Sequence, residues 1–269
     1  MSKKKTIIHP TAQIHPNAQL GEGVEIGAFT CVGAQVRIGS YTQISSSCVL
    51  EGDTQVGERC RIFTGVVLGA APQDLKYKNE PTRLVIGDDN IIREYVTMNR
   101  GTTASGHTRV GNKNLFMANS HVAHDCVVGD ETVIANVGTL AGHVTVERKA
   151  VVGGLVGVHQ FVRIGQIAII GGCSKVVQDV PPYAMADGHP ARVYGLNSLG
   201  VKRAGLSAAS IKQLKQAFKI IFFSRLSMTR ALALVESDMP PDPQVTYLLN
   251  FIRNSTRGLC RGGRERADT

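Results

Sequence analysis

The chain has 269 residues, of which 43% are hydrophobic and 19% charged, with 29 glycines, no tryptophan and a formal net charge of +9. This composition predicts a globular protein whose core is built from small branched side chains, and it excludes a disordered chain. No stretch approaches the roughly 18 apolar residues of a membrane-spanning helix. The apolar run after the basic N-terminus breaks at His9-Pro10, so we expect a cytoplasmic protein without a signal peptide or stable membrane insertion.

Cysteine spacing and charge distribution indicate the state of the thiols and the kind of partner. The six cysteines form no CxxC pair, which favours reduced, buried thiols over a disulfide framework. Basic residues gather near Lys3, near Lys202 and in the C-terminal tail. Such clusters suit an acidic partner or a solvated tail, and the lack of interleaved aromatic residues argues against nucleic acid.

The dominant pattern is an apolar residue at every sixth position. It runs from Ile8 to Leu68, resumes from Ile86 to Met98, and resumes again from Val110 to Val176. A period of six fits neither a helix nor an alternating strand. It predicts a hexapeptide-repeat β-solenoid with three short faces per turn, whose aliphatic residues point inward. Glycine often follows the apolar residue, and we expect it to permit a corner with unusual φ.

Two interruptions of the repeat select one face of this coil. They predict loops at about 71–83 and 100–109, and both leave from hexads of the same face. The next three hexads on that face carry His124, His143 and His159, with Gly142 one turn from His124 and Gln160 one turn further. Long loops on a regular scaffold often carry function, so the sequence predicts a site along this edge.

After the coil, which we expect to occupy 1–182, the pattern becomes helical. Ser207 can cap a helix with apolar residues from Ile211 to Phe222 on one stripe. A shorter helix is expected over 229–236 and a last one over 245–252. We therefore predict an α-helical domain over 183–257 and a disordered basic tail over 258–269.

The histidines allow more than one interpretation at this point. A histidine at a corner can be a solvated turn residue, and three from adjacent turns could bind zinc, although no HxxxH pair is present. Asp125 beside His124 could orient an imidazole base or cap a turn.

Several motifs together are far more specific than the repeat. They are NSHVAHDC at 119–126, LAGHV at 140–144, VHQF at 158–161, GGCS at 171–174, QDVPPY at 178–183, QDLKY at 73–77, EPTR at 80–83, Arg93-Glu94 and STRGL at 255–259, and the match that they mark extends over nearly the whole chain. With them the chain resembles the UDP-N-acetylglucosamine O-acyltransferases.

The resemblance implies a left-handed parallel β-helix in a homotrimer with active sites between subunits. It implies transfer of an R-3-hydroxyacyl chain from acyl carrier protein to the 3-hydroxyl of UDP-N-acetylglucosamine, the first step of lipid A biosynthesis, without cofactor or metal. His124 would be the general base, Asp125 its supporting carboxylate, and the Gly142 N–H would stabilise the oxyanion.

Other roles are carried over position by position. The positions that match substrate contacts in the family are Asp74, Lys76, His121, His143, His159, Gln160, Asn197 and Arg203. Gly172 matches the position that limits acyl length and would leave room for a long chain. The sequence departs from many relatives at Asn99, Leu199 and Ala204, which bears on nucleotide affinity and on the choice between N-acetylglucosamine and a 3-amino analogue.

Three other functions compete with this one. An N-acyltransferase of the same pathway usually carries a uridine-binding domain ahead of its coil, whereas the hexads here begin at Ile8. A metal-dependent hydratase of the carbonic anhydrase type would hold zinc at the histidines. A non-catalytic scaffold would need neither the loops nor the histidine column.

Overall fold

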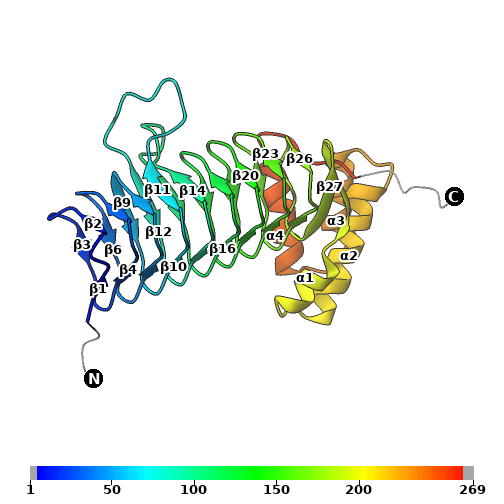
Figure 1. Cartoon of the computed structure of the whole chain (residues 1–269). Coiled ribbons are helices and arrows are strands. Elements are labelled where there is room, and N and C mark those ends of the chain that lie inside the picture. The colour runs from blue at the N-terminus through cyan, green and yellow to red at the C-terminus, as the bar shows by residue number, and fades with distance from the viewer. Residues whose placement is uncertain (1–4, 263–269) are drawn as a thin grey trace.

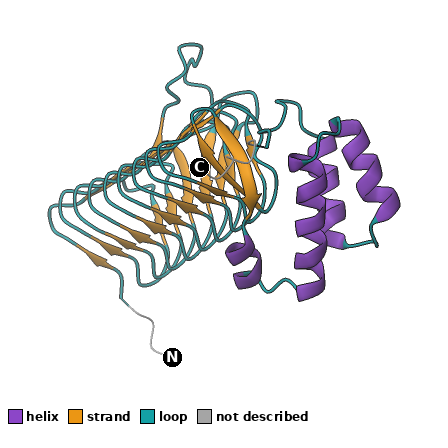
Figure 2. Ribbon diagram, turned by 90° about the vertical axis from the view of Figure 1, so that its right-hand side faces the viewer, coloured by secondary structure: helices purple, strands orange, loops and turns teal. Residues whose placement is uncertain are grey.

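The protein is an elongated coil of short strands followed by a group of helices at its C-terminal end (Figure 1). The computed structural model describes residues 5–262. The coil is a left-handed parallel β-helix whose strands stack into three sheets along the coil axis, while the helices lie beside its last turns (Figure 2). Among the described residues, none of the helices combines the length and the apolar character needed to cross a membrane.

The three sheets are called A, B and C in the order in which the chain visits them. Sheet A contains eleven strands, β1 (Ile7–Ile8), β4 (Glu25–Ile26), β7 (Gln43–Ile44), β10 (Arg61–Ile62), β13 (Ile91–Ile92), β16 (Leu115–Phe116), β19 (Val133–Ile134), β22 (Val151–Val152), β25 (Ile169–Ile170), β27 (Ala184–Gly188) and β28 (Ala191–Leu196). Sheet B contains nine, β2 (Gln13–Ile14), β5 (Cys31–Val32), β8 (Val49–Leu50), β11 (Val67–Ala70), β14 (Thr97–Asn99), β17 (His121–Val122), β20 (Thr139–Leu140), β23 (Gly157–Val158) and β26 (Lys175–Val176). Sheet C contains eight, β3 (Gln19–Leu20), β6 (Arg37–Ile38), β9 (Asp53–Val56), β12 (Arg83–Ile86), β15 (His107–Val110), β18 (Val127–Val128), β21 (Thr145–Val146) and β24 (Arg163–Ile164).

The predicted hexad positions form the core. From Ile26 to Val176 every one of them is buried, and only Ile8, Ile14 and Leu20 in the first turn keep contact with solvent. The parallel register places each inward apolar residue opposite the inward apolar residue of the next turn, as with Phe116 and Ile134. Removing these aliphatic columns from water is the main stabilising term of the coil.

The corners differ from our expectation for glycine. The residue with positive φ is the third after the apolar one, and it is usually not glycine: φ is 60° at Asp125, 63° at His143 and 64° at Phe161. The glycine directly after the apolar residue instead permits close approach of neighbouring turns. A Cβ on Gly39 would lie 2.5 Å from the carbonyl carbon of Gly57, and one on Gly57 would lie 2.5 Å from that of Gly87.

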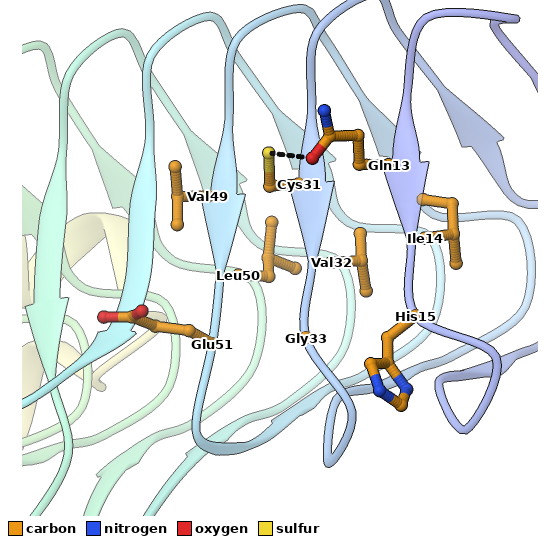
Figure 3. Close-up of a pocket in the computed structure, with 9 residues that line it drawn as sticks. All are labelled: Gln13, Ile14, His15, Cys31, Val32, Gly33, Val49, Leu50 and Glu51. Carbon is orange, nitrogen blue, oxygen red and sulfur yellow. Dashed lines mark hydrogen bonds between the residues drawn. The ribbon is translucent and has the colours of Figure 1, made fainter.

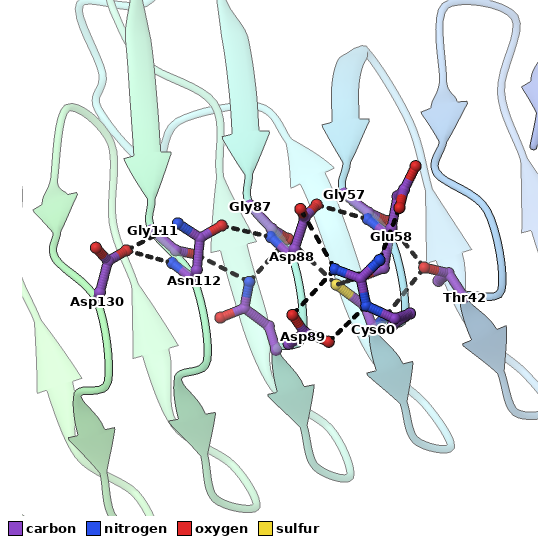
Figure 4. Close-up of polar contacts among 12 residues, drawn as sticks. Thr42, Gly57, Glu58, Cys60, Gly87, Asp88, Asp89, Gly111, Asn112 and Asp130 are labelled. Carbon is purple, nitrogen blue, oxygen red and sulfur yellow. Dashed lines mark hydrogen bonds and ion pairs between the residues drawn. The ribbon is translucent and has the colours of Figure 1, made fainter.

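These glycines form a column along the edge where sheet C passes into sheet A, and a polar ladder follows it (Figure 4). The Glu58 N–H donates to Asp88 at 2.8 Å, the Asp88 N–H to Asn112 at 2.8 Å, and the Asn112 N–H to Asp130 at 2.6 Å. Each side chain therefore satisfies the backbone of the preceding turn at a corner where no strand partner is available.

Both interruptions of the repeat lie at the edge between sheets B and C. The first loop, 71–82, follows β11, and the second, 100–106, follows β14. The first loop extends away from the coil (Figure 1). Arg100 links the two loops because its guanidinium donates to the Gly69 carbonyl at 2.7 Å and to the Tyr77 hydroxyl at 3.2 Å.

The C-terminal part begins with a hairpin that the sequence analysis did not predict. Strand β27 continues sheet A parallel to β25, and β28 returns antiparallel to it. Four helices follow, α1 (Ser198–Arg203), α2 (Ala208–Phe223), α3 (Met228–Asp238) and α4 (Pro243–Arg253). The Ser207 side chain accepts a hydrogen bond from the Ser210 N–H at the start of α2, so the predicted cap is confirmed.

Residues 258–262, which we expected to belong to the tail, pair with the rest of the chain. Leu259 forms a parallel bridge with Asp179, and Gly262 one with Val193. The remainder of the expected tail, 263–269, lies outside the described residues. All six cysteines are free, and Cys48, Cys60, Cys126 and Cys260 are buried as predicted, whereas Cys173 is exposed.

Candidate active site

The predicted face is sheet B, and its register is confirmed. Strands β11, β14, β17, β20 and β23 are consecutive neighbours in that sheet, so the two loops and the three histidine-bearing corners lie along one edge, hereafter the B–C edge. His124, Gly142 and Gln160 occupy equivalent positions of successive turns, and Asp125, His143 and Phe161 occupy the next position.

His124 and Asp125 form a buried pair at this edge. The Nδ1 atom of His124 lies 2.8 Å from Oδ2 of Asp125, and the side chains are 11% and 0% exposed. Because a carboxylate only accepts hydrogen bonds, Nδ1 carries the proton in this contact. In the neutral ring Nε2 then carries no proton, and it has no protein partner among the described residues.

The second loop surrounds the carboxylate of Asp125. Thr102 donates from its N–H to Oδ1 at 3.0 Å and from its hydroxyl to Oδ2 at 2.7 Å, and the Ser105 hydroxyl contacts Oδ1. Burial by itself would raise the pKa of Asp125, but the hydrogen bonds from Ser105, His124 and Thr102 outweigh it and lower that pKa to about 2. Asp125 is therefore ionised at neutral pH.

Two further histidines lie beside this pair. His143 makes an edge-to-face contact with His124, with ring centroids 5.2 Å apart, and stacks on Phe161 at 4.4 Å. Its Nε2 is 3.7 Å from Oδ2 of Asp125, which is too long for a hydrogen bond. His121 points outward from β17 and bonds the Thr97 hydroxyl at 2.7 Å, and burial lowers its pKa.

Gly142 lies directly against the imidazole of His124. A Cβ at this position would lie 2.5 Å from Cε1 and 2.7 Å from Nε2 of that ring, so a side chain would displace the imidazole. The Gly142 N–H donates to no acceptor among the described residues, while the Gly142 carbonyl accepts from the Phe161 N–H at 3.2 Å. Gly142, whose backbone donor is free, is therefore in close contact with the His124 ring that carries the free Nε2.

His159 and Gln160 continue the edge and are both exposed. Arg257, in the last described segment, places its guanidinium 3.0 Å from Nδ1 of His159 and 3.3 Å from the Val177 carbonyl. Because arginine only donates, Nδ1 of His159 accepts in this contact, and the proton of the neutral ring is then on Nε2.

The remaining predicted contact residues lie elsewhere. Asp74 caps a turn in the projecting loop, where its carboxylate accepts from the Lys76 N–H at 3.0 Å, and the Lys76 side chain is exposed. Asn197 and Arg203 line a hollow of about 320 Å³ between α1 and the sheet A side of the coil, together with Lys149. Gly172 lies at a third edge, between sheets A and B, where a Cβ would meet only the Gly154 backbone, at 3.2 Å.

One chain thus brings together His121, His124, Asp125, Gly142 and His143, while Asn197, Arg203 and Gly172 lie on other edges of the coil. The three positions at which the sequence departs from many relatives also lie in different parts of the structure. Leu199 and Ala204 line the Arg203 hollow, whereas the Asn99 side chain is buried and donates to the Ala71 carbonyl at 3.1 Å. Asn99 therefore supports the base of the first loop.

His124, Asp125 and His143 could together offer ligands to a metal ion. Single ligand atoms of His124, Asp125 and His143 lie within 4.8 Å of one another. The hydrogen bonds from the second loop and from His124, however, already engage both oxygens of Asp125. This donor set suits a hydrogen-bonded His–Asp pair better than a zinc site, in which the carboxylate would be a ligand.

A second hollow on sheet B is remote from these residues. It measures about 430 Å³ and is formed near the N-terminal end by residues of β2, β5 and β8, such as Gln13 and Cys31, and by residues directly after these strands, such as His15 and Glu51 (Figure 3). Strands β11 and β14 separate it from β17, so it is not part of the site at the B–C edge.

Comparison with known proteins identifies the family. Residues 179–260 match the family model for domain 2 of UDP-N-acetylglucosamine O-acyltransferase, and residues 5–40 match the bacterial transferase hexapeptide model. A Synechocystis protein named acyl-[acyl-carrier-protein]–UDP-N-acetylglucosamine O-acyltransferase is 50% identical over 80% of this chain and 78% of its own length. The chain belongs to the UDP-N-acetylglucosamine O-acyltransferase family.

Further relatives and a solved structure of this acyltransferase family also match this chain over most of its length. A Gloeothece citriformis protein of the same name is 47% identical over 80% of this chain and 78% of its own. The crystal structure of a UDP-N-acetylglucosamine acyltransferase from Bacteroides fragilis superposes with a TM-score of 0.92 at 40% identity, covering 95% of this chain and 100% of the other.

Four side chains around the site of this O-acyltransferase family member escaped the sequence reasoning: Thr102, Ser105, Phe161 and Arg257. Thr102 and Ser105 lie in a loop whose position was predicted but whose fold was not. Phe161 is one turn beyond His143 at the same hexad position, so the period could have indicated the stack. Arg257 lies within the STRGL motif, but no periodicity connects it to His159.

Proposed function

We propose that this protein transfers an R-3-hydroxyacyl chain from acyl carrier protein to the 3-hydroxyl of UDP-N-acetylglucosamine, the first step of lipid A biosynthesis. The observation that carries the proposal is the buried His124–Asp125 pair, whose ring with its free Nε2 packs against Gly142, a residue with a free backbone N–H. A base next to an oxyanion donor is the arrangement that acyl transfer to a hydroxyl needs. Relatives named for this reaction support the choice of substrates.

In the proposed mechanism Nε2 of His124 takes the proton of the sugar 3-hydroxyl as its oxygen attacks the thioester carbonyl. The carbonyl oxygen becomes an oxyanion, and the Gly142 N–H donates to it. Asp125 remains ionised and stabilises the imidazolium through Nδ1. When the tetrahedral intermediate collapses, the C–S bond breaks, the sulfur receives the proton from His124, and the ester and the free thiol leave.

The other positions supply binding contacts in this proposal. His121, His143, His159 and Gln160 offer polar groups along the B–C edge, where Arg257 contacts Nδ1 of His159. Asp74 and Lys76 reach substrate from the projecting loop, and Asn197 and Arg203 contact the nucleotide from their hollow. No cofactor or metal takes part.

A homotrimer would bring the separated residues together. The outward positions of sheet A from β13 to β25 form an aliphatic column, namely Ile91, Leu115, Val133, Val151 and Ile169. The adjoining edge between sheets A and B exposes Phe29, Tyr95 and Leu155, which are 66%, 59% and 61% exposed. The equivalent corner positions of the edge between sheets C and A are mostly charged, as at Arg59, Lys113 and Lys149.

We therefore propose that sheet B of one copy faces sheet A of the next, with the apolar A–B edges at the threefold axis. Exposed apolar surface of this extent is characteristic of a protein–protein interface. Each B–C edge then opens opposite the Asn197 and Arg203 hollow of a neighbouring copy. The acyl chain would run inward between the two sheets toward Gly172, and the acidic carrier protein suits the net charge of +9. We place this trimer in the cytoplasm.

The test is a panel of donors and acceptors with purified protein. Thiol release from 3-hydroxyacyl carrier protein should depend on UDP-N-acetylglucosamine, and mass spectrometry should find a single added acyl ester that alkaline hydroxylamine removes. An acyl amide formed on a 3-O-acylated glucosamine acceptor would indicate the N-acyltransferase instead. Zinc at one equivalent with hydratase activity, or no turnover with any pair, would contradict the proposal.

A further inference from the structure

The second loop, 100–106, folds back onto the site and meets the one carboxylate that contacts His124. Thr102 contacts both oxygens of Asp125 through two donors, at 3.0 Å and 2.7 Å, and Ser105 contacts Oδ1. The backbone N–H of Asp125 in turn donates to the Thr108 hydroxyl at 2.8 Å, in the strand that follows the loop. The loop and its exit strand therefore hold Asp125 by side chain and backbone together.

The direction of these hydrogen bonds can be assigned from their surroundings. The Thr102 hydroxyl accepts from the Ala104 N–H at 3.2 Å, so its own proton is available for Asp125. The Ser105 hydroxyl has two acceptors within reach, Asp125 and the His107 carbonyl at 2.9 Å. One proton serves one strong bond, and the ionised carboxylate is the better acceptor.

The loop donors leave the carboxylate of Asp125 one acceptor position, which His124 occupies. Three donors from the loop occupy Oδ1 and one position on Oδ2, and the other position on Oδ2 accepts Nδ1–H of His124. The side chain of Asp125 is fully buried, so its oxygens depend on these donors and on His124 for their hydrogen bonds. A carboxylate fixed at both oxygens cannot rotate toward His143, whose Nε2 is 3.7 Å away.

We propose that the loop 100–106 is a positioning element for the catalytic base, in which Thr102 and Ser105 hold Asp125 ionised and in one orientation and thereby keep His124 protonated on Nδ1. The proposal rests on the function proposed above, with His124 as the base. Thr102 and Ser105 touch no reacting atom and act through Asp125 alone. Without their donors the carboxylate interacts more strongly with the imidazolium of His124 and can also turn to His143.

The matched variants are Thr102→Val and Ser105→Ala, with Thr102→Ser as the conservative rescue. Thr103→Val is the control, because Thr103 is an exposed residue of the same loop without a hydrogen bond to Asp125. For Thr102→Val and Ser105→Ala we expect kcat to fall about tenfold or more, with KM for UDP-N-acetylglucosamine unchanged within about twofold. Thr102→Ser and Thr103→Val should behave as wild type.

Two readouts separate positioning from general damage to the fold. The acid limb of the kcat/KM profile should move to higher pH in Thr102→Val and Ser105→Ala, because a carboxylate with fewer donors favours the protonated form of His124; His121 and His143, the other titratable groups facing His124, are unaltered in these variants. Nitrogen-15 spectra of the histidines should show His124 protonated on Nδ1 in wild type and a mixture of tautomers in the variants.

The outcomes distinguish this inference from the proposed function. Wild-type kcat, pH profile and tautomer in both variants, with His124→Ala inactive, would overturn the role of the loop and leave the function intact. An inactive wild type would instead contradict the function. If Thr102→Val fails to fold, Ser105→Ala carries the test, since Ser105 lies on the exposed side of the loop.

Discussion

At the scale of single residues, the site depends on the absence of a side chain as much as on the histidine. The His124 ring occupies the space that a Cβ of residue 142 would need, with 2.5 Å to Cε1 and 2.7 Å to Nε2. Glycine here has no positive φ, so close approach to the ring, and not backbone conformation, requires it. The same position also supplies the free N–H.

Gly142→Ala should therefore leave the coil folded and strongly lower activity. The methyl group displaces the imidazole of His124 by a sizeable part of an ångström, and a misplacement of about 1 Å costs about 100-fold in rate. We expect kcat to fall about 100-fold with little change in the thermal midpoint of unfolding. The control is Gly33→Ala on the same edge, where a Cβ would come no closer than 3.4 Å to its neighbours. Wild-type kcat in Gly142→Ala would contradict this packing.

At the scale of the elements, local periodicity explains what the sequence could predict. One inward aliphatic residue per hexad fixes which corners stack, so the juxtaposition of His124, Gly142 and Gln160 followed from counting alone. Interactions between non-equivalent segments could not be counted in this way. The contact of Thr102 with Asp125 depends on how an irregular loop folds, and the contact of Arg257 with His159 joins residues far apart in the chain.

The role of the glycines at the corners could not be predicted from single hexads. We expected these glycines to adopt unusual φ, whereas Asp125, His143 and Phe161 do so and Gly39 and Gly57 do not. What requires the glycines is the backbone of the next turn, 2.5 Å from a Cβ. That distance is set by stacking between turns, which no single hexad reveals.

Gly172 provides a prediction about the edge between sheets A and B. Its Cβ would contact only the Gly154 backbone, so a longer side chain extends outward along this edge. If this edge holds the end of the acyl chain, Gly172→Met should move the preferred donor to a chain several carbons shorter, and Gly172→Ala should move it less. Competition between 3-hydroxyacyl carrier proteins of graded length measures the shift. An unchanged length profile in both variants would place the chain end elsewhere.

At the scale of the whole molecule, no single copy brings all of the predicted site residues together. His124 lies at the B–C edge, whereas Arg203 lines a hollow between α1 and sheet A. The apolar outer face of sheet A and the exposed apolar side chains of the A–B edge favour a ring of copies in which one contributes the base and the next the nucleotide contact. We propose that the reaction takes place between two copies.

Subunit mixing tests that claim most directly. Homotrimers of His124→Ala and of Arg203→Ala should each be strongly impaired, the first through loss of the base and the second through loss of a charge-assisted contact. Trimers re-formed from an equal mixture should contain intact sites in about a quarter of their clefts and recover about a quarter of the wild-type rate. Activity in the mixture no higher than the mean of the two variants would contradict a site shared between copies.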